Sequence, residues 1–320
     1  MSKNILVSDV GGTNGRFAIA DVSDTRTTPK IHSAHVLSCK NYASFYDMLD
    51  DYLSKIDSKR PEIAHLAIAG EMTPEHGNLW HFNWDISAKE IKDRFGFISV
   101  KLLNDYEALV KAVPYLKEGD LLTLTPNKNG LQDAPFCVFG AGSGLGGAIG
   151  VPMKLGLTVI STEIGHISFA PKNKVERDLL NYYAEKIDHI SNEIFLSGAG
   201  LIRLHEFISQ REEQPLSKRT GPEITKAAAE KSDVICQESV KLFLAILGSV
   251  AGDIALAHGA RHGVYIAGGV VPKIADMIDT GDFMQRFCNK GPMSPYVEKI
   301  PVHIITADMP ALIGAAIHNN

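Results

Sequence analysis

The sequence predicts a protein of the α/β class, and three features of the chain indicate it. The first 70 residues read as strand, strand, strand, helix, strand, an alternation that builds layered α/β folds. An apolar strand, a glycine-rich turn and a second apolar strand open the chain, and the same succession returns after residue 136. With 320 residues, the chain is long enough for about two domains of roughly 150 residues each.

The composition argues against several classes of function. The net charge of −5 and the lack of a Lys/Arg-rich block speak against a nucleic-acid partner. Four scattered cysteines without metal-ligand spacing predict a reducing, cytoplasmic location. The N-terminal apolar run is too short for a signal peptide. The longest apolar stretch, residues 242–257, contains Asp253 and is shorter than a membrane span. We therefore expect a buried core helix there and no membrane partner.

The opening turn, within residues 5–21, has the features of a phosphate site. Gly11 and Gly12 let the backbone bring its N–H groups close to an anion, and Thr13 adds a hydroxyl donor. Asp9 ends the first strand. Because a carboxylate repels phosphate, the expected partner of Asp9 is a cation carried by that phosphate, Mg²⁺. A hairpin whose glycines only serve the turn is the alternative. The Lys-Ser/Thr pair of a Walker-type phosphate loop is missing.

Local signals predict the elements that follow. Two serines with an acidic residue three positions later have the spacing of a capping box and start helices. In chain order we expect a strand at 31–37, a helix at 44–56, a strand at 63–69, a helix at 87–96 and a strand at 100–103. Residues 71–85 are predicted to be irregular. For Trp80 and Trp84 in that segment, burial in the core is favoured over stacking on a sugar ring.

Asn104 and Asp105 lie where the strand at 100–103 gives way to a helix. Ligands of α/β sheets collect beyond the carboxyl ends of strands, so this pair is well placed for a site. Either residue also serves as an ordinary helix N-cap, and both interpretations stay open. Pro114 closes the short helix and marks a candidate domain boundary.

A second glycine-rich turn repeats the opening motif. An apolar strand at 136–139 leads into Gly142, Ser143 and Gly144, and a further apolar strand starts near residue 148. One such turn is weak evidence. Two turns that share the order of apolar strand, glycines with a hydroxyl residue, and apolar strand indicate two hairpins that hold the phosphates of one nucleotide.

Two polar segments follow the second turn. Glu163 and His166 have a Glu-x-x-His spacing, but Gly165 and β-branched neighbours argue against a helix, and no cysteine ligands lie nearby. Recognition of a polyol fits these residues better than a metal. Glu193 is interpreted as a ligand contact or as a favourable charge at a helix start.

The remaining chain is predicted as a solvated loop, helices and two strands. In order these are a loop at 210–222, helices at 223–231 and 233–258, a strand at 263–267, a strand at 302–306 and a helix at 311–318. Gly268 and Gly269 follow the strand at 263–267, where they suit either a nucleoside lying against the backbone or a plain turn.

Together these segments resemble the bacterial glucokinase family of the actin-like ATPase superfamily, outside its ROK group, over essentially the whole chain. The motifs are Asp9-Val10-Gly11-Gly12-Thr13-Asn14, Asn104-Asp105, Gly140-Ala141-Gly142-Ser143-Gly144-Leu145-Gly146, Glu163-Ile164-Gly165-His166, Glu193 before Leu196-Ser197-Gly198, and Ile266-Ala267-Gly268-Gly269-Val270-Val271-Pro272. The resemblance implies a two-domain actin-like ATPase (ribonuclease H-like) fold with a nucleotide and sugar cleft between the lobes. We expect a small domain of residues 1–114 plus 303–320 and a large domain of residues 115–302.

The resemblance also implies an activity, the ATP-dependent phosphorylation of D-glucose at its 6-hydroxyl by a homodimer, feeding glycolysis. Asp105 would be the base, and the other sugar contacts would be Asn104, Glu163, His166 and Glu193. The nucleotide would be held by Gly11, Gly12, Thr13, Asn14, Gly142, Ser143 and Gly144 at its phosphates and by Gly268 and Gly269 at its adenosine. Asp9 would face Mg²⁺, directly or through water. The long apolar helix is the candidate dimer interface.

Two departures from the resembling family stand out. Its members usually carry Asn where this chain has His81, three residues before Trp84. The cysteine-rich zinc motif of the related ROK group does not follow His166, so no structural zinc is predicted. Two alternatives remain: a kinase for another hexose or an amino sugar, and a non-catalytic sugar-sensing regulator. The acidic charge and a first strand that begins near Asn4 disfavour the regulator, since no helix-turn-helix precedes that strand.

Overall fold

The computed structural model describes residues 4–23, 27–56 and 60–317 and divides into two compact units. Unit 1 comprises Met1–Asp120, Val159–Ser161 and Ala307–Asn320, and unit 2 comprises Leu121–Thr158 and Thr162–Thr306. The boundaries predicted from the sequence, after residue 114 and before residue 303, differ from this division by a few residues.

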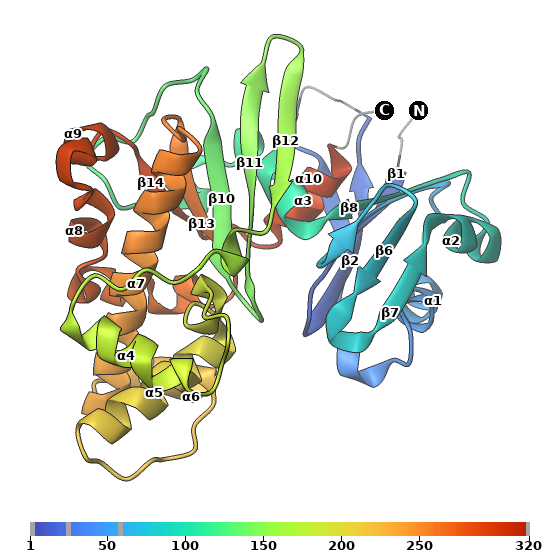
Figure 1. Cartoon of the computed structure of the whole chain (residues 1–320). Coiled ribbons are helices and arrows are strands. Elements are labelled where there is room, and N and C mark those ends of the chain that lie inside the picture. The colour runs from blue at the N-terminus through green and yellow to red at the C-terminus, as the bar shows by residue number, and fades with distance from the viewer. Residues whose placement is uncertain (1–3, 24–26, 57–59, 318–320) are drawn as a thin grey trace. The chain divides into compact units, whose positions relative to one another are not determined.

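A five-stranded mixed sheet forms the centre of unit 1 (Figure 1). In spatial order its strands are β3 (Lys30–Ser38), β2 (Asn14–Asp21), β1 (Asn4–Val10), β4 (Ile63–Ile68) and β8 (Ser99–Asn104). β1 pairs antiparallel with β2 and parallel with β4, and β4 pairs parallel with β8. The opening hairpin and the three later strands predicted for this part of the chain are confirmed.

Helices cover both faces of this sheet because the strand residues alternate between two cores. Leu6 packs in the same cluster as residues of α1 (Phe45–Lys55) and α2 (Ala88–Phe95). Ile5 and Val7 pack in another cluster. That cluster contains residues of α3 (Asp105–Ala112) and α10 (Pro310–Ala316). The predicted helix to residue 318 ends earlier, and His318 lies outside the described residues.

Residues 71–85 contradict the prediction that they are irregular. They contribute to a small antiparallel sheet of β5 (Glu71–Met72), β6 (His76–Leu79) and β7 (Trp84–Ser87). Trp84 is buried, and its Nε1 donates to the Ala43 carbonyl at 3.0 Å, which confirms the core interpretation for this residue. The Trp80 side chain lies outside the described part of the structure.

Unit 2 is built on a six-stranded sheet (Figure 1). In spatial order the strands are β12 (Gly156–Thr162), β11 (Leu145–Met153), β10 (Phe136–Ala141), β13 (Gly263–Ala267), β14 (Val302–Ile305) and β9 (Leu121–Thr123). β10 and β11 form the second predicted hairpin, and β10, β13 and β14 run parallel. The two hairpins therefore stand in equivalent positions, one in each unit.

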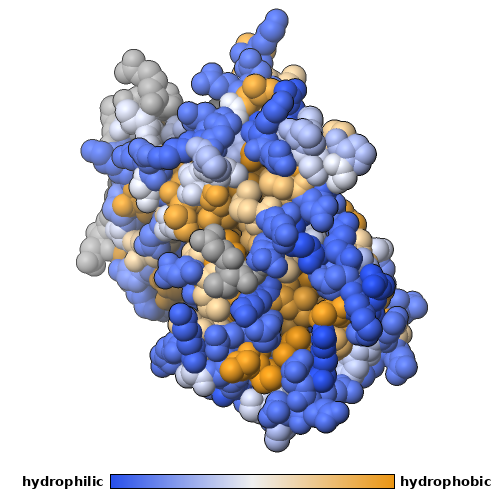
Figure 2. All heavy atoms as spheres, turned by 90° about the vertical axis from the view of Figure 1, so that its left-hand side faces the viewer, coloured by the Kyte–Doolittle hydropathy of each residue, from blue (hydrophilic) through white to orange (hydrophobic). Residues whose placement is uncertain are grey.

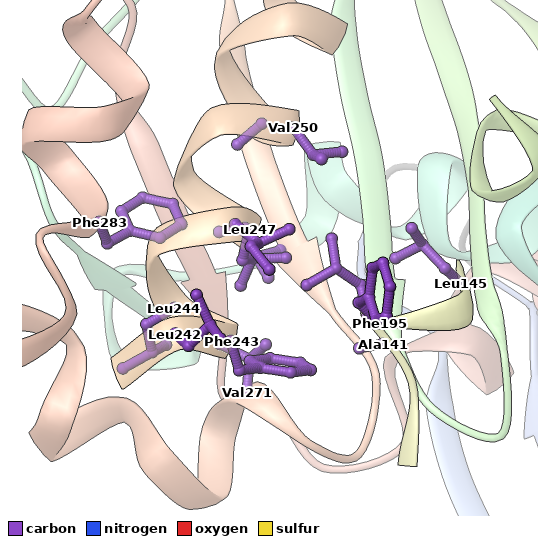
Figure 3. Packing of buried hydrophobic residues seen from close by; sticks show 14 of the residues in the cluster. Ala141, Leu145, Phe195, Leu242, Phe243, Leu244, Leu247, Val250, Val271 and Phe283 are labelled. Carbon is purple, nitrogen blue, oxygen red and sulfur yellow. The ribbon is translucent and has the colours of Figure 1, made fainter. Parts of the chain in front are cut away.

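Six helices of the described residues accompany this sheet: α4 (Lys174–Ala184), α5 (Gly198–Arg211), α6 (Gly221–Ala229), α7 (Val234–Ala257), α8 (Phe283–Cys288) and α9 (Ser294–Val297). By length and composition α7 could span a membrane, but 72% of its apolar window is buried inside the molecule. Figure 3 shows α7 side chains such as Phe243 and Leu247 packed among core residues of unit 2. The core of unit 2 thus explains the apolar length of α7, and its role as a dimer interface stays a prediction.

The face of the molecule drawn in Figure 2 is largely hydrophilic, with hydrophobic residues gathered in patches between the polar ones. Apolar atoms contribute about half or more of the surface of ordinary folded proteins. These patches alone therefore do not identify an interface.

Candidate functional site

The opening turn of unit 1 is closed by backbone hydrogen bonds. Gly11 N donates to the Asn14 carbonyl at 3.0 Å, and Cys39 N donates to the Thr13 carbonyl at 3.0 Å. A Cβ added to Gly12 would lie 3.1 Å from the imidazole carbons of His81. The segment that contains His81 therefore lies directly against the turn to which the phosphates were assigned.

Asp9 forms an ion pair within the hairpin. Its Oδ2 accepts from Arg16 Nη1 at 3.0 Å, and the two residues face each other across β1 and β2. Burial raises the pKa of the Asp9 carboxyl above its usual value, and the Arg16 guanidinium opposes part of that rise. Sequence reasoning missed Arg16. Antiparallel pairing counted outward from the glycine turn would have matched it with Asp9.

Asn104 is the N-cap of α3. Its Oδ1 accepts from Tyr106 N at 2.9 Å, and its Nδ2 donates to the Gly70 carbonyl at 3.1 Å. Asp105 Oδ1 accepts from the same Tyr106 N at 3.0 Å. The capping interpretation of Asn104 is confirmed, and it does not exclude a ligand contact, because the amide has further hydrogen-bonding capacity.

The strand register brings the two parts of unit 1 to one edge of the sheet. Ile68 in β4 faces Val10 on one side and Asn104 on the other. Strands lie about 4.8 Å apart, so the start of the glycine turn and Asn104 are separated by about 10 Å. The carboxyl ends of β1, β4 and β8 therefore present the opening turn, Asn104 and Asp105 together.

In unit 2, Glu163 and His166 flank a single 3₁₀ turn, Ile164–His166, directly after β12. Buried Ile164 anchors this turn, while Glu163 and His166 are exposed. A Cβ on Gly165 would lie 2.0 Å from the Leu145 carbonyl, so the turn packs tightly on β11. Among the described residues, no group of three or more His, Cys, Asp or Glu side chains could hold a metal ion.

Glu193 lies on a second 3₁₀ turn, Asn192–Ile194. The backbone before this turn pairs with the backbone after His166, since Asn192 N donates to the Ile167 carbonyl at 2.9 Å. The carboxylate of Glu193 accepts from Leu145 N at 2.8 Å, beside the glycine turn. Unit 2 thus brings together the segments that carry Glu163, His166, Glu193 and the second turn.

The second turn is closed by Gly142 N, which donates to the Gly144 carbonyl at 2.8 Å. At the end of β13, Gly268 has a φ of +87°, and a Cβ there would lie 2.3 Å from the Ala141 carbonyl. Backbone geometry alone therefore demands glycine at this position. Gly269 has open space around its Cβ position, which leaves room for a ligand beside it.

Comparison with known proteins gives consistent matches over the whole chain. A family model described as Glucokinase matches residues 6–320. A glucokinase of Caulobacter sp. (strain K31) is 37% identical, with 98% of this chain and 94% of that protein covered. One from Chromohalobacter salexigens is 36% identical, with 100% and 99% covered.

Solved structures agree in fold. A glucokinase from an Antarctic psychrotroph superposes with a TM-score of 0.85 at 31% identity, covering 99% of this chain and 98% of that one. A ROK family glucokinase from Streptomyces griseus, solved in complex with glucose and AMPPNP, has a TM-score of 0.67 at 17% identity and covers 98% of both chains. At that identity the likeness shows the shared fold alone.

Proposed function

Because the chain belongs to the glucokinase family and has the actin-like ATPase fold, we propose that it transfers the terminal phosphoryl group of ATP to the 6-hydroxyl of D-glucose. The products are glucose 6-phosphate and ADP. The observation that carries this proposal is the register of β1, β4 and β8, which presents a glycine turn and an Asn-Asp pair at one sheet edge.

Asp105 is proposed as the catalytic base. As the 6-hydroxyl oxygen attacks the terminal phosphorus, its proton passes to the Asp105 carboxylate and the bond from phosphorus to the ADP oxygen breaks. A positioned base contributes roughly 10²–10⁴-fold to a rate. The rest of the acceleration in phosphoryl transfer comes mainly from positioning and charge neutralisation.

Asn104, Glu163, His166 and Glu193 are proposed to hydrogen-bond the other sugar hydroxyls. A site that satisfies each hydroxyl rejects epimers, because an epimer leaves buried polar groups of the protein without partners. Each of these residues stands at the end of a strand or on a short turn, where hydrogen bonds or a buried neighbour fix its position.

The phosphates are assigned to the turns formed by Gly11, Gly12, Thr13 and Asn14 and by Gly142, Ser143 and Gly144, and the adenosine to Gly268 and Gly269. The Streptomyces griseus structure was solved with AMPPNP, an ATP analogue, which supports ATP as donor. Mg²⁺ bound with ATP would neutralise phosphate charge. Asp9 fits a Mg²⁺ held through water, because its Oδ2 is engaged by Arg16 and Mg²⁺ retains several waters.

The proposal extends to the setting of the reaction. We place the enzyme in the cytoplasm as a homodimer, with its product entering glycolysis. The scattered free cysteines are consistent with a reducing compartment. Analytical ultracentrifugation at micromolar concentration tests the assembly, and a species of 34.8 kDa alone would refute the dimer.

A coupled assay of ADP formation tests the central proposal. Purified protein is given ATP with glucose, mannose, fructose, galactose or N-acetylglucosamine, each with and without Mg²⁺. Turnover that is selective for glucose and requires Mg²⁺ is expected. Turnover on a different sugar would reassign the substrate while keeping the fold, and tight sugar binding without turnover would indicate a sensor.

A further inference from the structure

We propose that Glu193 is a positioning residue that links sugar recognition to the phosphate-holding turn of unit 2. This rests on the proposed function, in which Glu193 contacts glucose and Gly142, Ser143 and Gly144 contact the nucleotide. The structure adds a direct hydrogen bond between Glu193 and Leu145, the residue that follows this turn, and this bond links the two sets.

The bond joins the carboxylate of Glu193 to the first residue after the turn. Leu145 N donates to Glu193 Oε2 at 2.8 Å. A second bond runs alongside it, from Gly198 N to the Gly142 carbonyl at 2.9 Å. The 193–198 segment therefore holds the glycine turn at both of its ends.

The core of unit 2 supports both partners of the bond between Leu145 N and Glu193. Leu145, Phe195 and Ala141 of β10 belong to one buried cluster, and Figure 3 labels all three among its residues. The Glu193 carbonyl accepts from Ser197 Oγ at 3.0 Å, and the same hydroxyl accepts from Gly200 N at the start of α5. These bonds fix the backbone of Glu193. Its carboxylate therefore reaches the turn from a rigid backbone.

Gly144 provides independent evidence for the link. A Cβ at this position would lie 2.4 Å from Glu193 Oε2, well inside contact distance. Gly144 is not among the glycines of the described residues that have a positive φ, so a left-handed backbone does not explain a glycine here. A side chain at this position would therefore have to displace the Glu193 carboxylate, the group to which the sugar contact is assigned.

The chemistry allows one carboxylate to serve both purposes. Two oxygens with about four lone-pair sites can accept several donors. The bond from Leu145 N uses Oε2, and Oε1 retains the capacity to accept from a sugar hydroxyl. A glucose bound to Oε1 would then sit on the group that fixes the turn, which couples the binding of glucose to that of ATP.

A substitution in the phosphate turn tests this link through the sugar. Gly144→Ala should displace the flexible end of Glu193 and weaken glucose binding, measured calorimetrically without nucleotide, by about tenfold or more. Gly119→Ala, at an exposed glycine outside the proposed site, is the control, since a Cβ there meets nothing within 4 Å. It should leave glucose affinity within about twofold of the wild type. If the wild type binds no glucose, the proposed function fails. If it does and Gly144→Ala binds glucose equally well, the link is refuted.

A second pair of variants keeps the test informative if Gly144→Ala does not fold. Glu193→Gln keeps an oxygen acceptor for Leu145 N, whereas Glu193→Ala removes it. AMPPNP binding is measured in the absence of sugar, so that a lost sugar contact cannot contribute. Glu193→Ala should weaken it by about fivefold or more, and Glu193→Gln should restore it to within about twofold of the wild type. A Glu193→Ala affinity equal to that of the wild type would overturn the proposal.

Discussion

Asp105 can be tested by a substitution that preserves its surroundings. In the Asp105→Asn variant, the side-chain amide oxygen can still accept from Tyr106 N, as the carboxylate does at 3.0 Å. The start of α3 is therefore retained. It cannot take up a proton. We expect kcat to fall by roughly 10²–10⁴-fold, while the dissociation constant of glucose changes little. Steady-state kinetics and calorimetry measure the two quantities, and near-full turnover would remove Asp105 from its role.

Single residues also show where sequence reasoning stopped. Asp9 stands out because a carboxylate beside a glycine turn is unusual, but its partner Arg16 depends on the hairpin register. His81 was identified only as a departure from the resembling family. That its ring lies against Gly12 required the three-dimensional arrangement, since the two residues are far apart in the chain.

At the scale of elements, the features with local signals were predictable. Ser44 and Ser87 accept from the N–H three residues on, at 3.2 and 3.3 Å, as their capping patterns predicted. The sheet of β5, β6 and β7 was missed because its strands have only two to four residues. Such short strands carry too few residues for alternation to show, and their stability comes from cross-strand pairs.

A buried ion pair connects three helices of unit 2. Glu176 of α4 is fully buried and receives two hydrogen bonds from Arg286 of α8, at 2.6 and 3.0 Å. The Arg286 Nε also donates to Ser249 of α7 at 2.9 Å. Arg286→Met should lower the free energy of unfolding by about 3–5 kcal/mol, because it leaves a buried carboxylate without its partner. Urea denaturation at pH 7 measures this loss.

The control lies on the same helix. Lys174 pairs with Asp178 at 2.8 Å, but the Lys174 side chain is 82% exposed. Exposed pairs contribute about 0–1 kcal/mol, so Lys174→Met should have a small effect. Equal losses in the two variants would show that the Glu176–Arg286 pair has no special role in joining α4, α7 and α8.

At the scale of the whole molecule, the α/β class and both glycine hairpins followed from the order of elements along the chain. Apart from Glu193, which lies on a 3₁₀ turn, the candidate residues stand at or next to strand ends, positions that can be predicted from hydrophobic patterns. Patterns alone do not say that Asp105 of unit 1 and Glu193 of unit 2 act on one sugar. That assignment came from the resemblance and remains part of the proposed function.

Stability of the folded chain should depend on pH through a buried histidine. His303 of β14 is 4% exposed, its Nδ1 lies 2.9 Å from Thr123 Oγ1, and its ring stacks on Tyr265. Burial lowers the pKa of His303 to about 4, and the nearby His262 contributes to this shift. In the unfolded chain a histidine has a pKa of about 6.5.

Between these two values the unfolded chain binds the proton and the folded chain does not, so the free energy of unfolding falls as the pH falls from about 6.5 toward 4. By pH 4.5 the contribution of His303 should be a loss of about 2–3 kcal/mol. His303→Gln removes the titrating ring while keeping a side chain that can hydrogen-bond. Urea denaturation of the wild type and of the variant gives the free energy of unfolding that each loses between pH 7 and pH 4.5. Subtracting the variant's loss from that of the wild type cancels the titration of all other groups. The wild type should lose about 2–3 kcal/mol more than the variant; equal losses would mean that His303 takes up its proton in the folded state as readily as in the unfolded chain.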